Sequence, residues 1–236
     1  MAATPLTAAA TSTLESAGVT TLVGTVVNAA GLCHAKTVPV NRMSAFANPG
    51  LGASPVWHVF TVDQAGIAVG GAIALHFAAR YPERTSAVAV GSPATGIAAE
   101  RRAPALERLA RIEAAGMAFA VEDSMLNGYA PELRGDLRRF ERFRTRWLGN
   151  DPSSYATIWR MLAAADMQDE LARLACPVLV IGGSLDRVRP PQLAEGTAKA
   201  IPGARYAEIR TGHYMSVQTP DLLSDTIEEF LTSVGA

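Results

Sequence analysis

The sequence predicts an α/β protein in which a parallel β-sheet is interrupted by a block of helices. From residue 56 onward, short apolar segments alternate with segments of helical periodicity, as is typical of strands connected by helices. Residues 177–182 (PVLVIG) are wholly apolar, as expected of a parallel strand that is buried on both faces. Residues 66–71 (GIAVGG) form a glycine-rich turn between a strand-like and a helix-like segment.

The predicted elements follow in order along the chain. Residues 19–27 (VTTLVGTVV) are rich in β-branched side chains after a glycine, and residues 56–62 (VWHVFTV) are also strand-like. The glycine-rich turn leads into a helix that runs to about residue 81, and a strand at 85–90 (TSAVAV) follows. Helical runs with charged faces fill residues 100–173. The remaining elements are the strand 177–182, a helix at 193–200, a strand at 205–210 and a closing helix at 220–233.

The first quarter of the chain differs in composition from the rest. Residues 1–62 contain only three charged side chains, Glu15, Lys36 and Arg42. With so few charges to mark a solvated face, the folded form of this segment is not evident from its pattern. We expect a loose terminus over residues 1–17 and a sheet whose N-terminal part is incomplete or atypical.

Length, charge and cysteine content restrict the function classes. The 236 residues suit one sizeable domain, and 21 basic against 22 acidic residues give a net charge of -1. Nucleic-acid and membrane partners need concentrated basic patches, so we expect neither. Cys33 and Cys176 fit no metal or redox spacing, so we expect no cofactor and a cytoplasmic protein with reduced thiols. Residues 19–32 are too short for a membrane span and lack the positive start of a signal peptide.

Three loops that follow predicted strands carry the candidate chemistry. The turn GIAVGG has the spacing of a G-x-S-x-G nucleophile elbow but holds Ala68 at the serine position, and it lacks the spacing of nucleotide-binding loops. Asp186 follows the strand 177–182, and His213 follows the strand 205–210. An elbow, an acid and a histidine in this order are typical of a hydrolytic triad, in which the carboxylate orients the imidazole base. Ser92 lies in a Gly-Ser-Pro sequence that is typical of a turn.

Residues 66–236 resemble the α/β-hydrolase fold, in particular the 3-oxoadipate enol-lactonase-like hydrolases. The resemblance rests on GGAIALHFAARYPER at the elbow helix, GSLDRVRPP at the acid loop and TGHYMSVQTP at the histidine loop. It implies that Asp186 is the orienting acid, that His213 is the general base and that Ala68 occupies the nucleophile's place. It also implies an atypical N-terminal segment at 1–55, a hydrolase core at 56–99 and 174–236, and a helical cap at 100–173.

The resemblance implies further site residues. The backbone N–H of Val69 would be one oxyanion donor, and Leu51 would lie in the loop that supplies the second, although a plain glycine turn explains that loop equally well. Arg187 would attract a carboxylate substrate or pair with the neighbouring acid, and Trp147 would pack in a core or line an apolar pocket. The predicted substrate-binding residues are Trp147, Arg187 and Tyr214.

The sequence departs from this family's pattern in two places. Ala68 cannot attack a carbonyl, and residues 54–65 are too few for the crossover unit that the fold places before the elbow. Three hypotheses remain open: weak, water-mediated hydrolysis through His213 and Asp186, non-catalytic binding of a small molecule, and an inactive product of a disrupted gene. The expected partner is a small-molecule ester, lactone or carboxylic acid. The sequence also leaves open whether the chain forms a homo-oligomer.

Overall fold

The computed structural model describes residues 21–27, 33–39 and 67–235. The chain divides into two compact units, Met1–Trp57 and His58–Ala236. In the first unit, β1 (Thr21–Val27) and β2 (Cys33–Pro39) pair antiparallel from Thr21↔Pro39 to Val27↔Cys33. The expectation of a strand at 19–27 agrees with β1. The predicted loose terminus at 1–17, the candidate oxyanion loop at 44–54 and the predicted strand at 56–62 lie outside the described residues.

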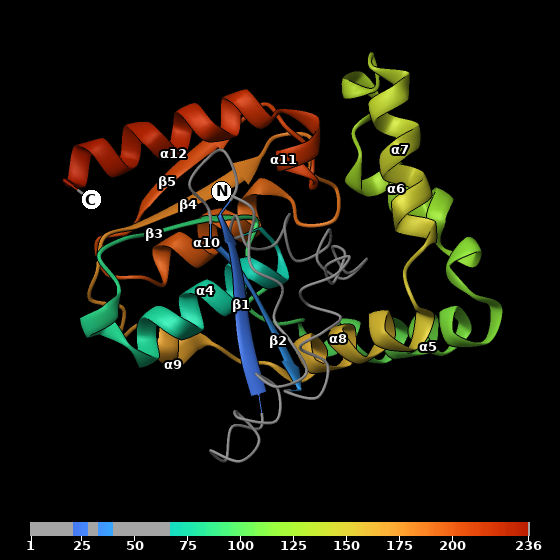
Figure 1. Cartoon of the computed structure of the whole chain (residues 1–236), viewed down its shortest axis with the longest axis horizontal. Coiled ribbons are helices and arrows are strands. Elements are labelled where there is room, and N and C mark those ends of the chain that lie inside the picture. Colours follow the sequence, from blue (N-terminus) through green and yellow to red (C-terminus); the bar gives the residue numbers. More distant parts are fainter. Residues whose placement is uncertain (1–20, 28–32, 40–66, 236) are drawn as a thin grey trace, which may run out of the picture. The chain divides into compact units, whose positions relative to one another are not determined.

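The second unit contains the expected parallel sheet (Figure 1). Its strands are β3 (Val88–Gly91), β4 (Val178–Gly183) and β5 (Arg205–Ile209), and β4 lies in the centre. The register pairs Val88 with Val178 and Leu179 with Arg205. The strand predicted at 85–90 begins at Val88 in the structure, after a short 3-10 turn at Pro82–Arg84.

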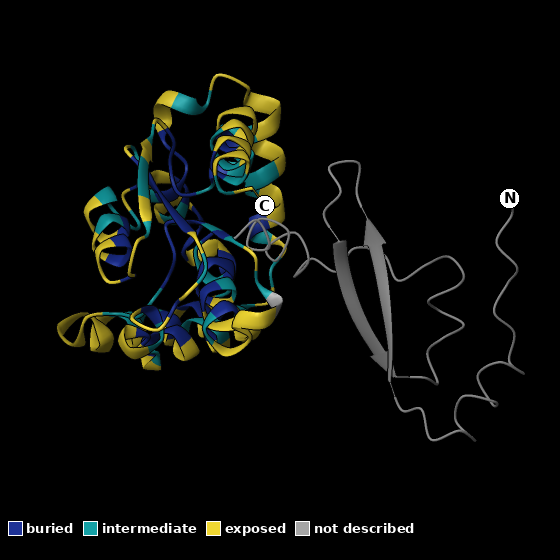
Figure 2. Ribbon diagram, turned by 90° about the vertical axis from the view of Figure 1, so that its left-hand side faces the viewer, coloured by how far each residue is buried: buried dark blue, intermediate teal, exposed yellow. Residues whose placement is uncertain are grey.

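The two faces of the sheet pack against different helices because strand side chains alternate in direction. In β4, Val178 and Val180 contact the cluster that contains α4 (Val69–Arg80) and α10 (Pro191–Lys199). Leu179 and Ile181 instead join the cluster of α12 (Pro220–Val234) on the opposite face. All six residues of β4 are buried, and the buried residues run through the middle of this unit (Figure 2). The wholly apolar pattern of 177–182 therefore reflects contacts on both faces.

A helical block connects β3 to β4. It comprises α5 (Ala99–Ala115), α6 (Val121–Gly128), α7 (Leu137–Leu148), α8 (Pro152–Ala164) and the short α9 (Gln168–Leu171), with 3-10 turns at Met117–Phe119 and Pro131–Leu133. The carboxylates of Asp136 and Asp151 accept backbone hydrogen bonds at the starts of α7 and α8. The block has an apolar cluster of its own, rich in aromatic rings, which includes Tyr129 and Trp147. By contrast, α9 packs against α4 and so belongs to the core of the sheet.

Candidate active site

The turn before α4 holds Ala68 in a strained backbone conformation. Its φ is 51° and its ψ is -113°, a region that L-residues rarely occupy. The Ala68 N–H donates to the Gly91 carbonyl at 2.9 Å, and the Ala68 carbonyl accepts the N–H of Ala94 at 2.8 Å. The backbone geometry of a nucleophile elbow is therefore present and is anchored to the loop after β3, although the side chain at its apex is a methyl group.

The carboxylate of Asp186 lies just beyond β4 and is only 3% exposed. Its Oδ1 accepts the backbone N–H groups of Val188 and Arg189, each at 2.8 Å. Its Oδ2 accepts the Ser92 hydroxyl and the Nδ1–H of His213, also at 2.8 Å. Four donors therefore surround a buried carboxylate, and both of its oxygens are paired.

His213 follows β5 and is nearly buried, at 8% exposure. The carboxylate of Asp186 accepts only from a protonated Nδ1, so it fixes the neutral ring in the tautomer whose Nε2 carries a lone pair. The backbone N–H of His213 donates to the carbonyl of Gly128, at the end of α6, at 2.9 Å. The sequence-predicted acid and base thus form a buried, oriented pair.

The sequence predicts that Ser92 is a turn residue, and the structure adds a second role. Its φ of 40° agrees with a tight turn. Its hydroxyl is fully buried and donates to Asp186, which lies 94 positions later in the chain. The sequence signal for this role is that Ser92 closely follows a predicted strand, as Asp186 does, whereas the contact itself depends on β3 being next to β4 in the sheet. The loop after β3 thereby joins Ala68 to the Asp186–His213 pair.

The loops of the pair are bound to the helical block. In addition to the bond from His213, the backbone N–H of Arg187 donates to the Asn127 carbonyl at 3.2 Å. Gly128 permits a close approach, because a Cβ there would lie 2.6 Å from the Tyr214 ring. Arg134 donates to the carbonyls of Met125 and Tyr129 and so stabilises the end of α6. Two loops of the sheet and one helix end therefore form a single hydrogen-bonded unit.

Aromatic side chains pack behind the histidine. The Tyr214 ring lies 5.6 Å from the His213 ring and 4.5 Å from the Phe143 ring, centre to centre. Burial raises the pKa of the Tyr214 phenol well above its usual range and outweighs the lowering effect of a hydrogen bond with Trp147. The Trp147 side chain itself is 7% exposed within the apolar cluster of the helical block. The predicted substrate-binding residues Trp147 and Tyr214 are therefore neighbours.

The other predicted site residues have different surroundings. The Arg187 side chain is exposed, whereas burial lowers the pKa of the nearby Arg189 guanidinium. Val69 is the first residue of α4, where backbone N–H groups have no partner within the helix. Leu51 lies outside the described residues.

The part of the chain that the structure describes holds no group of three or more His, Cys, Asp or Glu side chains that could bind a metal ion. Within the same residues, no helix is long and apolar enough to cross a membrane.

The sheet order, the elbow, and the acid and histidine loops at one sheet edge define an α/β-hydrolase fold. Residues 61–211 match the hydrolase family described as Serine aminopeptidase, S33 (Hydrolase_4), and the chain belongs to this family. The match covers the elbow and Asp186 and ends two positions before His213.

Individual relatives agree with this assignment. The chain is 24% identical over 164 residues to 3-oxoadipate enol-lactonase 2 from Acinetobacter baylyi, which covers 69% of this chain and 61% of that protein. It resembles the solved enol-lactonase from Burkholderia xenovorans LB400 (27% identity, TM-score 0.63, 70% and 64% coverage). It also resembles a thermophilic esterase from Thermogutta terrifontis (25% identity, TM-score 0.65, 72% and 64% coverage). The chain thus spans less than two thirds of these relatives' lengths.

Proposed function

We propose that this protein acts on small carboxylic esters or lactones, and that His213, oriented by Asp186, is its general base. This proposal rests on the buried Asp186–His213 pair. Its carboxylate accepts four hydrogen bonds, and the Nε2 of its imidazole carries the lone pair. A structural ion pair would not require the strained elbow turn at Ala68 beside it. The names of the esterase and lactonase relatives support the same substrate class.

Because Ala68 carries no nucleophilic atom, the reaction proceeds without an acyl-enzyme. His213 Nε2 removes a proton from a water molecule, and the hydroxide attacks the carbonyl carbon of the ester. The oxyanion of the tetrahedral intermediate accepts the backbone N–H of Val69. Collapse of this intermediate breaks the bond to the leaving oxygen, which takes the proton from His213, so one ester and one water yield an acid and an alcohol. General-base catalysis of this kind contributes about 10²–10⁴-fold, so turnover is weak.

The test compares the hydrolysis rates of the parent protein and three variants on p-nitrophenyl acetate and on a simple aromatic lactone. The parent is expected to hydrolyse both slowly and without a burst, and His213→Ala is expected to abolish that activity. Ala68→Ser is expected to raise kcat/KM by about 10²-fold or more and to release a burst of about one equivalent of nitrophenol. Asp186→Asn leaves the imidazole in the wrong tautomer and should fall below the parent. A folded Ala68→Ser variant with neither burst nor gain would contradict the placement of the elbow.

A second candidate function is ligand binding without turnover, and the single observation in its favour is that Ala68 replaces the nucleophile. It predicts saturable binding of the carboxylic acid product and parent turnover equal to that of His213→Ala. Steady parent turnover that depends on His213 excludes it.

A further inference from the structure

A groove of about 380 Å³ opens on the surface of the helical block, and neither Asp186 nor His213 lines it. Four arginines of α7 line it: Arg138, Arg139, Arg142 and Arg146. Phe143, also from α7, and Val217, from α11 (Met215–Gln218), form its apolar part. We name this feature the arginine groove. Its volume lies within the range of small-molecule sites, about 300–1,000 Å³.

The spacing of these arginines on α7 places them on one face of the helix. Positions 138, 142 and 146 are four residues apart, and position 139 is three before 142, so their side chains are neighbours. Phe140, Phe143 and Trp147 lie on the adjoining face, which packs into the aromatic cluster of the block. Arg144 faces elsewhere and pairs with Glu122 of α6. The row of arginines is therefore separate from the face that stabilises α7 by packing.

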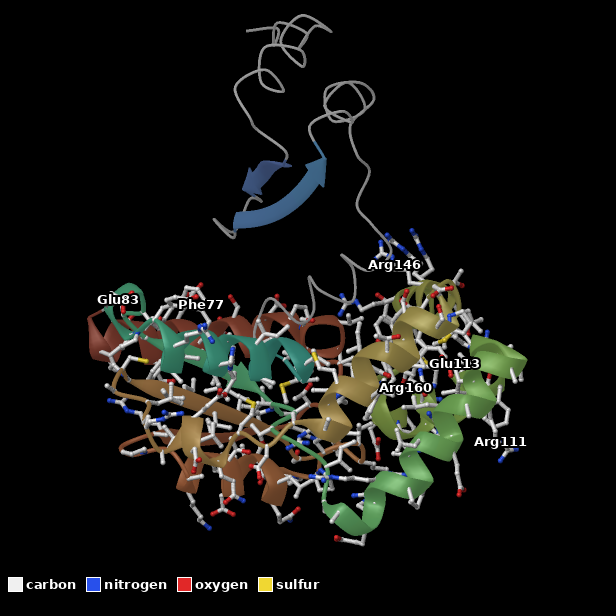
Figure 3. All side chains as sticks on the ribbon, turned by 90° about the horizontal axis from the view of Figure 1, so that it is seen from below. Phe77, Glu83, Arg111, Glu113, Arg146 and Arg160 are labelled. Atoms are coloured by element: carbon white, nitrogen blue, oxygen red, sulfur yellow. The ribbon has the colours of Figure 1, made fainter. Side chains whose placement is uncertain are left out.

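The charges along the groove are unbalanced. Among the residues that the structure describes, Asp136 is the one acidic residue in its lining, and its carboxylate lies 3.5 Å from the Arg139 guanidinium. For Arg138, Arg142 and Arg146, the described residues provide no ion pair. Like charges at a spacing of four destabilise a helix, so this row does not serve the stability of α7. All four arginine residues are exposed, and Arg146 lies on the outer surface of α7 (Figure 3). The arrangement has the features of an anion-binding site.

The groove adjoins the candidate active site through one pair of rings. Phe143 lines the groove and contacts Tyr214, which in turn contacts His213. Val217 is four positions after His213 on the helix that continues its loop. An occupant of the groove therefore lies against the segment that carries the candidate base.

We propose that the arginine groove binds a small organic polyanion that carries at least two negative charges on carboxylate or phosphate groups. Guanidinium groups recognise both kinds of oxyanion through paired hydrogen bonds, and several along a concave wall favour multiple charges over one. The apolar part formed by Phe143 and Val217 accommodates the carbon skeleton. Since this is a binding site for a charged molecule, it does not depend on hydrolysis at the Asp186–His213 pair.

The test is calorimetric titration of the intact parent chain at low ionic strength with pyrophosphate, citrate and acetate. Saturable binding of pyrophosphate or citrate, weakened by added sodium chloride, is expected, and acetate should bind far more weakly. The double variant Arg142→Gln/Arg146→Gln should weaken polyanion binding by about ten-fold or more, and Arg138→Gln should weaken it further. Both replaced arginines of the double variant are exposed, so its thermal melt should match that of the parent.

The matched control is Arg144→Gln, which removes the same charge from the same helix but outside the groove. It should leave the dissociation constant within about two-fold of the parent. Preference for pyrophosphate assigns a phosphorylated ligand, and preference for citrate assigns a polycarboxylate. Absence of saturable binding, or an equal loss in Arg144→Gln and in the double variant Arg142→Gln/Arg146→Gln, overturns the proposal.

Discussion

Replacing Ala68 with glycine should stabilise the protein, contrary to the usual effect of glycine. Residues in sparsely populated backbone regions cost about 1–3 kcal/mol, and glycine tolerates the observed φ of 51° without that cost. Against this gain, glycine makes the unfolded chain more flexible, which costs about 0.4–1 kcal/mol. We therefore expect the free energy of unfolding to rise by about 1 kcal/mol and the melting temperature by about 2–4 °C.

The assay is urea denaturation followed by circular dichroism, with a scanning calorimetry melt as a second measure. The matched control is Ala110→Gly, at an exposed position in the middle of α5, which should destabilise by about 0.5–1 kcal/mol. The two variants should therefore move in opposite directions and differ by about 2 kcal/mol. If Ala68→Gly destabilises the protein as much as Ala110→Gly does, the strained turn at residue 68 is refuted.

Three other predictions concern the surroundings of the site. Ser92→Ala removes a buried donor to the Asp186 carboxylate and should cost about 1.5–3 kcal/mol in urea unfolding; a cost under about 0.5 kcal/mol would contradict the bond. Gly128→Ala places a Cβ 2.6 Å from the Tyr214 ring and should destabilise by about 1–3 kcal/mol, and an unchanged melt would argue against that contact. Burial raises the pKa of Tyr206 to about 12, so the folded state holds this proton more tightly and the associated stability is lost as pH rises from about 10 through 12. Phenolate absorbance near 295 nm should therefore lag in the folded chain relative to the chain in urea.

Much of the fold was predictable because its signals are local. The apolar run at 177–182 indicates a strand buried on both faces, and β4 confirms it. The positions of Asp186 and His213 after two strands predict that they meet, because parallel strands end at one sheet edge. Neither inference needs knowledge of contacts between distant segments.

The features that could not be predicted depend on such contacts. The bond from Ser92 to Asp186 requires the sheet order β3-β4, which no turn signal specifies. The spacing of the α7 arginines predicts a solvated helix face, and they are exposed. Their groove could not be predicted, because its lining also includes Val217 of α11, which is distant in the sequence. The strain at Ala68 is indicated by the elbow spacing of GIAVGG alone, since alanine itself has no preference for that conformation.

Two backbone hydrogen bonds tie the end of α6 to the acid and histidine loops, from the N–H of Arg187 to the carbonyl of Asn127 and from the N–H of His213 to the carbonyl of Gly128. A displacement of α6 would leave both N–H groups without these partners, and an unpaired buried donor costs about 1–3 kcal/mol. The position of the helical block and the positions of the two loops are therefore energetically linked, so a substitution that shifts α6 is felt at the Asp186–His213 pair although it lies on another element.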